Sequence, residues 1–377
     1  MQSNLTRGIL CLVGGVSMNI FLGCFYLWGN IQVYVTSYLH KYDSSVNLND
    51  TVMIGPIMTA CQAIASPIGP YLLQYTEPWV IILMGTGLAL TGIVASTFTT
   101  NFTAFFFLYG VFYGLGIGIA IIIPLMTSWA YFPKRKGMVS GTIIGGYGFG
   151  GFIFGYISFA LVNPDNISPD YEVPGGKIFH PDLSICDRAP YMLRVNAIIW
   201  ACLILISLIL VRRLPEESYS KVSANEDSEL NPNPSVAINA VENSLISIDP
   251  QTKEEYYKVL PTVKEALLHY KTWMIVIMAL ISMCQGLFTA YVFKSYGEIY
   301  IADDAFITTV GTFAAVSNGL SRVYWSNLQD VFGYKCIYFT ILVIQIFVGF
   351  TIQMVNKSKP LYFIWIFASF SCLGGHF

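Results

Sequence analysis

The stretch from Phe102 to Met126, FTAFFFLYGVFYGLGIGIAIIIPLM, runs for 25 residues without a charged side chain. A membrane core about 30 Å thick is crossed by a helix of roughly 20 apolar residues, so this stretch predicts a membrane-spanning helix. Nine comparable runs occur elsewhere, and the ten predicted spans are 8–29, 52–74, 78–99, 102–126, 138–161, 191–211, 272–293, 305–327, 334–355 and 360–377. The sequence therefore predicts an all-α membrane protein with the lipid bilayer as a partner.

The composition of the whole chain supports this prediction. Hydrophobic residues make up 55% and charged residues only 11%, whereas a soluble domain has about 25% charged residues. Too few polar side chains are available to cover a surface that faces water. The formal net charge of −2 argues against nucleic acid as a partner. Most cysteines lie in or beside apolar runs, and only Cys186 lies in a polar loop, so no disulfide framework is expected.

The ten spans fall into two series separated by a polar segment. We predict an N-terminal six-helix bundle over 1–213, a partly disordered cytoplasmic linker over 214–271, and an incomplete four-helix bundle over 272–377. This order resembles the six-plus-six plan of major facilitator carriers, so we expect a C-terminally truncated chain with about 10 of 12 helices. The acidic linker is interpreted as a tether rather than a regulatory site, and the segment from Thr262 to Tyr270 predicts a short amphipathic helix. A monomer is expected.

Lysine and arginine residues predict the orientation of the chain. With a cytoplasmic N-terminus, 13 of the 20 basic residues fall on the cytoplasmic side, as the positive-inside rule requires. The Asn-x-Ser/Thr triplets at Asn49, Asn101, Asn166 and Asn356 then lie in outer loops, as expected of a glycoprotein. The Pro- and Gly-rich segment 163–190 predicts an irregular outer loop. The expected location is the plasma membrane or an endomembrane.

No catalytic or cofactor-binding constellation stands out. There is no metal-ligand spacing or nucleophile triad, and the glycine run at 146–151 (GYGFGG) lies inside an apolar span rather than after a strand. The sequence therefore predicts a protein that is not an enzyme and needs no cofactor or metal. Glycines in the spans 102–126 and 138–161 are interpreted mainly as close-packing positions, and a carrier also needs such smooth faces for its halves to slide.

Arg322 is the one basic residue placed clearly within a predicted span, and all 22 acidic residues are placed in loops or at span ends. A charged side chain at the centre of a spanning helix costs about 2.5–3.5 kcal/mol. A substrate carboxylate about 4 Å away would return about 4 kcal/mol at an effective dielectric of 20. Asn318 precedes Arg322 by one helical turn and shares its face. The alternative is that Arg322 reaches the inner interface and pairs with Asp330.

Two further basic side chains have different interpretations. Arg194 lies about one turn inside its predicted span, and its side chain is expected to extend to the interface. His376 is the one imidazole predicted to lie well inside a span, where it could titrate or donate a hydrogen bond to an anion. We therefore include His376 among the candidate substrate-binding residues.

Several short motifs resemble those of one transporter family. The loop from Ala130 to Gly141 (AYFPKRKGMVSG) looks like the aromatic-Phe-Pro-basic-basic-Gly-x-x-x-Gly element of the oxalate:formate antiporter family, which monocarboxylate transporters share. Further matches, which together touch most of the chain, are LGCFYLWGN at 22–30, QAIASPIG at 62–69, YGVFYGLGIGIAIIIP at 109–124, SNGLSR at 317–322 and the pair Gly374 and Gly375. The match at 22–30 favours the oxalate:formate group over the monocarboxylate group.

The resemblance implies a major facilitator fold and a set of site residues. In the family, the basic residue of span eight contacts the anion, and the matching residue here is Arg322. Tyr26 and Gln62 match positions that face the cavity, whereas the aromatic residue expected near the end of span four is Ile121. The residues that match the conformational loop motifs are Pro133, Lys134, Arg135 and Gly137 in the first half, and Asp330, Gly333 and Lys335 in the second half.

These features predict a secondary transporter of small organic anions, such as oxalate, formate or other mono- and dicarboxylates, that works by alternating access. Three alternatives stay open. A proton-coupled monocarboxylate symporter would need His376 or another residue to carry the proton. A receptor built on a carrier fold would bind without transport, and a membrane enzyme is disfavoured because no catalytic constellation is visible.

Overall fold

The computed structural model describes residues 2–214 and 268–376 of the chain. All ten predicted spans coincide with helices. Among the described residues, eight helical segments are long and apolar enough to cross a membrane. The two other predicted spans form α17 (Asp304–Phe332) and α19 (Lys359–Gly374). The chain is therefore a multi-pass membrane protein, as the hydropathy pattern predicts.

The first span is longer than predicted, because α1 (Gln2–Leu22) continues through η1 (Gly23–Leu27) into α2 (Trp28–Tyr42). The predicted end at residue 29 is wrong: no helix-breaking residue follows it before Asp43. Gly23 lies at the tight 3-10 segment, where a Cβ would sit 1.8 Å from the carbonyl oxygen of Tyr147. Only a residue without a side chain allows this approach of two helix backbones.

The other spans of the N-terminal series are also built partly from shorter helices. The second contains α3 (Leu48–Val52), α4 (Ile54–Ala65) and α5 (Ile68–Leu72), and the third is α6 (Pro78–Ser96). The fourth contains α7 (Phe102–Phe105), the π-helical η2 (Phe106–Phe112), α8 (Tyr113–Ala120) and α9 (Ile123–Tyr131). The turn η3 (Pro133–Arg135) leads into α10 (Lys136–Val162), and α11 (Ser184–Leu210) follows.

The second series begins with α16 (Tyr270–Tyr300), and α18 (Tyr334–Val355) lies between α17 and α19 in sequence. The chain divides into two compact units, one formed by Met1–Arg212 with Ser282–Phe377 and the other by Arg213–Ile281. Most of the predicted linker 214–271, including most of the expected helix from Thr262 to Tyr270, lies outside the described residues. The predicted domain limits therefore stay a prediction.

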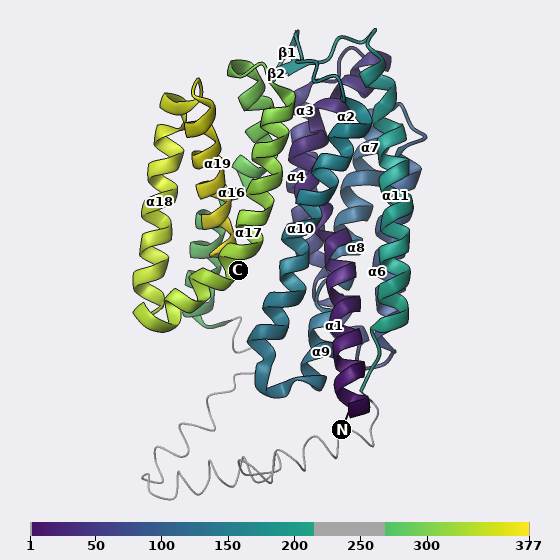
Figure 1. Ribbon diagram of the computed structural model, residues 1–377, viewed down its shortest axis with the longest axis vertical. Helices are drawn as coiled ribbons and strands as arrows, with labels where there is room; N and C mark the ends of the chain where they lie inside the picture. Colours follow the sequence, from purple (N-terminus) through teal and green to yellow (C-terminus); the bar gives the residue numbers. More distant parts are fainter. Residues whose placement is uncertain (1, 215–267, 377) are drawn as a thin grey trace, which may run out of the picture. The chain divides into compact units, whose positions relative to one another are not determined.

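Helix α10 packs on both series of helices, with α1 on one side and α17 on the other (Figure 1). Towards α17, a Cβ on Gly148 would meet Gly319 Cα at 2.8 Å, and one on Gly151 would meet Ala315 Cβ at 2.8 Å. Towards α1, a Cβ on Gly150 would lie 2.1 Å from the Ile20 carbonyl oxygen. The glycines of α10 thus allow close packing against both α17 and α1, as predicted from the sequence.

The segment predicted as an irregular outer loop contains regular structure, so this prediction is partly wrong. Strands β1 (Tyr171–Val173) and β2 (Gly176–Ile178) form an antiparallel hairpin, whose turn uses Gly175 at a φ of +94°. Glycine adopts positive φ without steric cost, so the same composition that suggests irregularity also permits a tight turn. Helix α11 then begins at Ser184, ahead of the predicted start, and tolerates Pro190 near its beginning.

The predicted glycosylation triplets differ in accessibility. The side chains of Asn49, Asn101 and Asn166 are exposed, whereas Asn356 is only 7% exposed and donates a hydrogen bond to Tyr296 Oη at 3.3 Å. A buried amide cannot receive a glycan without local opening, so Asn356 does not fit the prediction in this conformation. The other three positions stay predictions.

Candidate functional site

The side chain of Arg322 is half-buried on α17 and is oriented by a fixed amide. Its Nη2 atom donates a hydrogen bond to Asn318 Oδ1 at 3.3 Å. Asn318 is fully buried, and its Nδ2 atom donates to the carbonyl oxygen of Phe370 on α19 at 3.2 Å. Because both ends of the Asn318 amide are engaged, its oxygen stays directed at the guanidinium, as the shared helix face predicts.

Aromatic side chains from the N-terminal series complete the surroundings of Arg322. The Arg322 Cζ atom lies 6.0 Å from the centre of the Tyr147 ring. Tyr26, from η1, interacts through its hydroxyl with both Arg322 and Asn318. The Tyr26 ring packs edge-on against Tyr147 at 5.6 Å and lies 6.1 Å from the Phe370 ring. We call Arg322, Asn318, Tyr26 and Tyr147 the Arg322 site, and it is built from both series of helices.

The predicted alternative pairing of Arg322 with Asp330 involves a side chain outside the described ones. Asp330 lies eight residues after Arg322 on α17, which corresponds to about 12 Å along the helix axis. The Nη2 atom of Arg322 is directed at Asn318, one turn towards the start of the helix. The pairing of Arg322 with Asp330 therefore stays a prediction.

For two predicted substrate-binding residues, Gln62 and His376, no described hydrogen bond reaches Arg322. Gln62 is half-buried on α4, and within residues 2–214 and 268–376 no hydrogen bond connects its side chain to Arg322 or Asn318. His376 lies after α19, where its Nε2 atom is 3.0 Å from Gln345 Oε1 and its ring packs against Tyr338 at 5.5 Å. The binding roles of Gln62 and His376 therefore stay predictions.

The predicted loop-motif residues occupy the two turns that the sequence indicates. Pro133 opens η3, and the side chain of Arg135 is exposed, whereas the side chains of Lys134 and Asp330 are not among the described ones. Gly333 joins α17 to α18 at φ +79° and ψ +153°, a conformation that is essentially restricted to glycine. Gly137 and Lys335 are exposed. The conformational role of these residues stays a prediction.

Arg194 belongs neither to the loop motifs nor to the Arg322 site. Its Nε donates to Thr97 Oγ1 at 3.1 Å, its Nη2 donates to the Thr97 carbonyl oxygen at 3.0 Å, and its Cζ lies 4.6 Å from the Phe98 ring centre. These contacts tie the start of α11 to the end of α6. Arg194 thus has a packing role between these two helices, and its extension to the membrane interface stays a prediction.

A second buried basic residue, Lys294 of α16, lies in a polar cluster that the sequence analysis missed. Lys294 is 0% exposed, and its Nζ atom lies 2.5 Å from Asp304 Oδ1 and 3.9 Å from Glu298 Oε1. The same ammonium group donates to Tyr34 Oη and to Thr308 Oγ1, each at 3.1 Å. It also lies 4.2 Å from the centre of the Tyr34 ring.

Residues of the N-terminal series hold the other oxygen of Asp304. Tyr34 Oη donates to Asp304 Oδ2, and Asn163 Nδ2 donates to the same oxygen at 2.6 Å. Phe179, just after β2, stacks on Tyr34 with ring centres 5.5 Å apart. We call Lys294, Glu298, Asp304, Tyr34 and Asn163 the Lys294 cluster. Like the Arg322 site, it joins the two series of helices.

The Lys294 cluster corrects the predicted end of one span. The predicted span 272–293 ends one residue before Lys294, whereas α16 continues to Tyr300 and buries Lys294 inside the protein. The acidic residues were expected in loops or at span ends. Glu298 and Asp304 do lie near the end of α16 and at the start of α17, but they are buried, at 3% and 0% exposed. The available signal was the spacing of Lys294 and Glu298 by four residues, which places them on one face of a continuing helix.

An exposed ion pair flanks the cluster. Lys359 pairs with Asp303, and Asn166 Nδ2 donates to Asp303 Oδ1 at 3.2 Å. Burial raises the pKa of Asp303, but the hydrogen bonds from Lys359, from the Phe306 backbone N–H and from Asn166 lower it by more, so that the pKa lies below its usual value. Asp303 therefore carries its negative charge at neutral pH.

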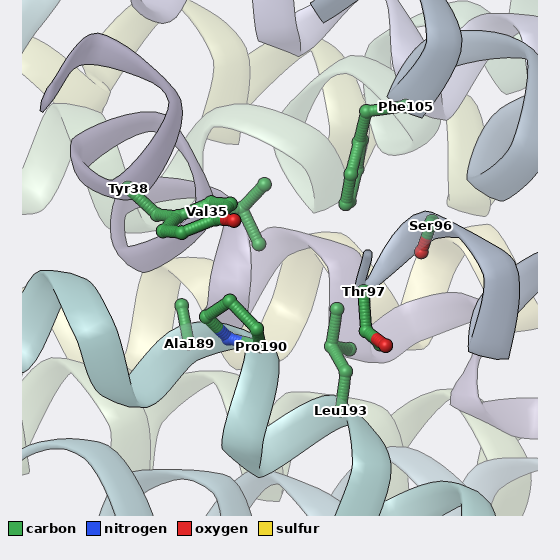
Figure 2. A pocket seen from close by; sticks show the side chains of 8 residues that line it. All are labelled: Val35, Tyr38, Ser96, Thr97, Phe105, Ala189, Pro190 and Leu193. Carbon is green, nitrogen blue, oxygen red and sulfur yellow. The ribbon is translucent and has the colours of Figure 1, made fainter. Parts of the chain in front are cut away.

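Two crevices of the described surface are lined by residues outside the Arg322 site and the Lys294 cluster. A narrow crevice between α2, α7, α11 and the end of α6 is lined by Val35, Tyr38, Ser96, Thr97, Phe105, Ala189, Pro190 and Leu193 (Figure 2). It has about 0 Å³ of room for a water molecule. A more open groove of about 340 Å³ is lined by Gln285, Leu342, Gln345, Ile346, Gly349 and Phe350. Its mainly apolar lining does not fit a small anion.

Comparison with solved structures identifies the class of fold. The chain is similar to the xylose transporter XylE from E. coli in a partially occluded inward-open conformation, with a TM-score of 0.62, 13% identity, and coverage of 99% of this chain and 82% of XylE. It is also similar to a bacterial homologue of the human lysosomal transporter Spinster, with a TM-score of 0.60, 13% identity, and coverage of 98% and 73%. The chain thus has the major facilitator-type transporter fold that the span pattern predicts.

Sequence comparison adds one particular relative. The chain is 24% identical over 425 aligned positions to apicoplast pyruvate carrier 1 of Toxoplasma gondii, and the alignment covers 98% of this chain and 76% of that protein. No protein-family model matches the sequence. The fold and this relative indicate a secondary transporter and not an enzyme, as predicted. The finer resemblance to the oxalate:formate antiporter family stays a prediction.

Proposed function

We propose that this protein carries small carboxylates across a membrane by alternating access, and that Arg322 binds the carboxylate group. The observation that carries the proposal is the Arg322 site itself. A guanidinium is held by a buried amide and lies beside two tyrosine side chains, and these groups come from both series of helices. Such a position lets one bound anion contact both halves of a carrier.

The chemistry of the site suits a small planar anion. A guanidinium presents paired N–H donors that match the two oxygens of a carboxylate. At about 4 Å and an effective dielectric of 20, the attraction of one such pair is about 4 kcal/mol. The hydroxyl groups of Tyr26 and Tyr147 add potential donors, and the Phe370 ring adds an apolar wall. This combination supports a short carboxylate with a small apolar part.

The relative named a pyruvate carrier supports monocarboxylates as the first substrates to test. One guanidinium neutralises one carboxylate, which agrees with pyruvate, lactate or formate. Oxalate stays a candidate because of the motif resemblance. The name of that relative also refers to the apicoplast, so an organellar membrane joins the plasma membrane among the proposed locations.

Alternating access is supported by the seam between α10 and α17. Gly148 and Gly151 of α10 face Gly319 and Ala315 of α17 without intervening large side chains. A carrier must exchange contacts along such a face when it changes between its two open states. The Arg322 site lies on the same two helices, so binding at Arg322 can influence the packing of the seam.

The test is exchange transport by the purified protein in liposomes. Vesicles preloaded with unlabelled pyruvate are expected to take up radiolabelled pyruvate, and unlabelled lactate, formate and oxalate are compared as competitors. Arg322→Gln is expected to weaken pyruvate binding at least ~100-fold, because losing about 3 kcal/mol corresponds to that factor. Arg194→Gln is the matched control, since Arg194 also lies on a spanning helix but binds Thr97.

Two results would contradict the proposal. Unchanged pyruvate affinity in Arg322→Gln would remove Arg322 from the binding site. Saturable binding of carboxylates without any flux, in vesicles that retain folded protein, would instead support the receptor alternative.

A further inference from the structure

Glu298 is buried without the hydrogen bonds that an ionised carboxylate needs. It is 3% exposed, and within the described part of the chain neither Oε1 nor Oε2 accepts a hydrogen bond. Its closest cationic group is Lys294 Nζ at 3.9 Å, whereas Lys294 lies 2.5 Å from Asp304. A buried carboxylate without donors is costly, so a neutral, protonated form of Glu298 is favoured.

The charge balance of the Lys294 cluster leads to the same conclusion. Full ionisation would place one positive and two negative charges in a site that excludes water. The carboxyl groups of Glu298 and Asp304 both lie beside Lys294 Nζ, at 3.9 Å and 2.5 Å, and two neighbouring carboxylates do not both ionise readily. One bound proton makes the cluster electrically neutral. The proton also provides an O–H hydrogen-bond donor among carboxylate oxygens that otherwise can only accept hydrogen bonds.

The remaining groups that face Glu298 do not offset its charge. On α16 the facing group is Lys294, on α17 it is Asp304, on α2 it is Tyr34, and on α19 it is Tyr362. The two phenols are ordinarily neutral near pH 7. Lys294 is already engaged by Asp304, Tyr34 and Thr308.

We propose that Glu298 and Asp304 share one proton beside Lys294, and that this proton is co-transported with the carboxylate. The inference rests on the proposed transport function. In the binding step, a proton from the adjacent aqueous compartment bonds to a carboxylate oxygen of the pair. In the release step the same O–H bond breaks and the proton returns to water, so no other reactant is needed.

The geometry links this proton to the change between open states. Tyr34 and Asn163, which donate to Asp304, belong to the first series of helices, whereas Lys294, Glu298 and Asp304 belong to the second. Separation of the two series at this end withdraws both donors from Asp304 and admits water to Glu298. The proton can then exchange with only one side of the membrane at a time, as coupled transport requires.

The central experiment compares two modes of transport by Glu298→Gln. Exchange of labelled for unlabelled pyruvate needs no net proton movement, so it is expected to stay within about threefold of the wild-type rate. Uptake driven by an inward proton gradient is expected to fall at least tenfold and to lose its dependence on pH. Glu172→Gln, at an exposed glutamate of β1, is the control and is expected to behave as wild type.

Asp304→Asn is a second variant, which removes the other carboxylate of the pair. It leaves Lys294 and Glu298 as a neutral ion pair that has no need of a proton. Gradient-driven uptake is therefore again expected to be lost while exchange continues. Proton-driven uptake that persists in both variants would overturn the proposal.

A measurement without substrate separates this proposal from the transport function. Infrared difference spectra recorded across a pH change should show a protonated carboxyl band in the wild-type protein that is missing in Glu298→Gln. If wild-type vesicles exchange pyruvate through Arg322 but move no protons with it, the proton proposal fails and the transport function stands. If no carboxylate moves at all, the transport function fails, and absence of the carboxyl band would also reject the shared proton.

Discussion

The Arg322 site and the Lys294 cluster both place a basic side chain between the two series of helices, but they treat its charge differently. Lys294 is fully buried, lies 2.5 Å from one carboxylate and has a second carboxyl group 3.9 Å away. Arg322 is half-buried and is held by the Asn318 amide beside tyrosine rings. The protein thus supplies the counter-charge of Lys294 itself, whereas the described partners that orient Arg322 are amide and phenol groups.

This difference suggests separate roles for the two basic side chains, Lys294 and Arg322. A buried lysine with an acidic partner stabilises the fold. Its charge is already neutralised, so this site is better suited to binding a proton than to binding a substrate anion. A guanidinium held by an amide keeps its donors in a defined direction, which suits capture of an external anion. The predictions below test this division of roles.

The largest expected effect is on stability. Lys294→Met leaves Asp304 buried without its cation, and removing one partner of a buried ion pair costs about 3–5 kcal/mol. The melting temperature of the purified protein should therefore fall strongly, whereas Arg322→Gln should change it little. Adding Asp304→Asn to Lys294→Met should recover most of the loss. Equal destabilisation by Lys294→Met and Arg322→Gln would contradict the comparison.

The next effect concerns the glycine seam on which the Arg322 site lies. In Gly148→Ala the new Cβ would meet Gly319 Cα at 2.8 Å and the Ala315 carbonyl oxygen at 2.9 Å, so helices α10 and α17 must move apart. Overpacking of this kind costs about 1–3 kcal/mol. Thermal unfolding and the rate of pyruvate exchange should both be reduced.

Gly145→Ala is the matched control for this seam. It lies on the same helix, and a Cβ there would meet nothing within 4 Å. Alanine favours a helix over glycine by up to about 1 kcal/mol, so this variant should be neutral or slightly stabilised. A stability loss as large as that of Gly148→Ala would show that close packing is not the cause.

A smaller effect should distinguish charge from geometry at Arg322. Arg322→Lys keeps the positive charge but loses the paired donors and the fixed contact with Asn318. Pyruvate should bind roughly tenfold more weakly, which corresponds to about 1.4 kcal/mol. Titration of binding to the purified protein measures this change, and wild-type affinity in the lysine variant would show that a point charge is sufficient.

The smallest effect is expected at the exposed pair of Asp303 and Lys359 beside the Lys294 cluster. Because hydrogen bonds lower the pKa of Asp303, its stabilisation is complete above its unfolded pKa of about 3.9 and is lost as the pH falls through the lower folded value. Asp303→Asn should therefore cost at most about 1 kcal/mol near neutral pH. Unfolding measured at several pH values should show the difference from wild type vanish in acid, and a difference that grows in acid would contradict this assignment.

The sequence predicted much of the fold because hydropathy is a local property. Each of the ten apolar runs is helical, and the pair Asn318 and Arg322 shares a face as its spacing requires. The errors occur where polar residues are buried by remote partners. Lys294 and Glu298 were placed outside a span because charge in a single segment signals water, yet Tyr34, far away in sequence, contacts Lys294, and Asn163 binds the neighbouring Asp304.

By itself, the amino-acid sequence determined that this protein crosses a membrane many times, and it indicated one arginine within a span. Apolar length and helical spacing are sufficient for both conclusions, since they depend only on neighbouring residues. The tertiary structure alone decided that Tyr147 lies beside Arg322, that His376 contacts Gln345, and that Glu298 is buried. These features depend on contacts between helices distant in the chain, whose geometry no local pattern specifies.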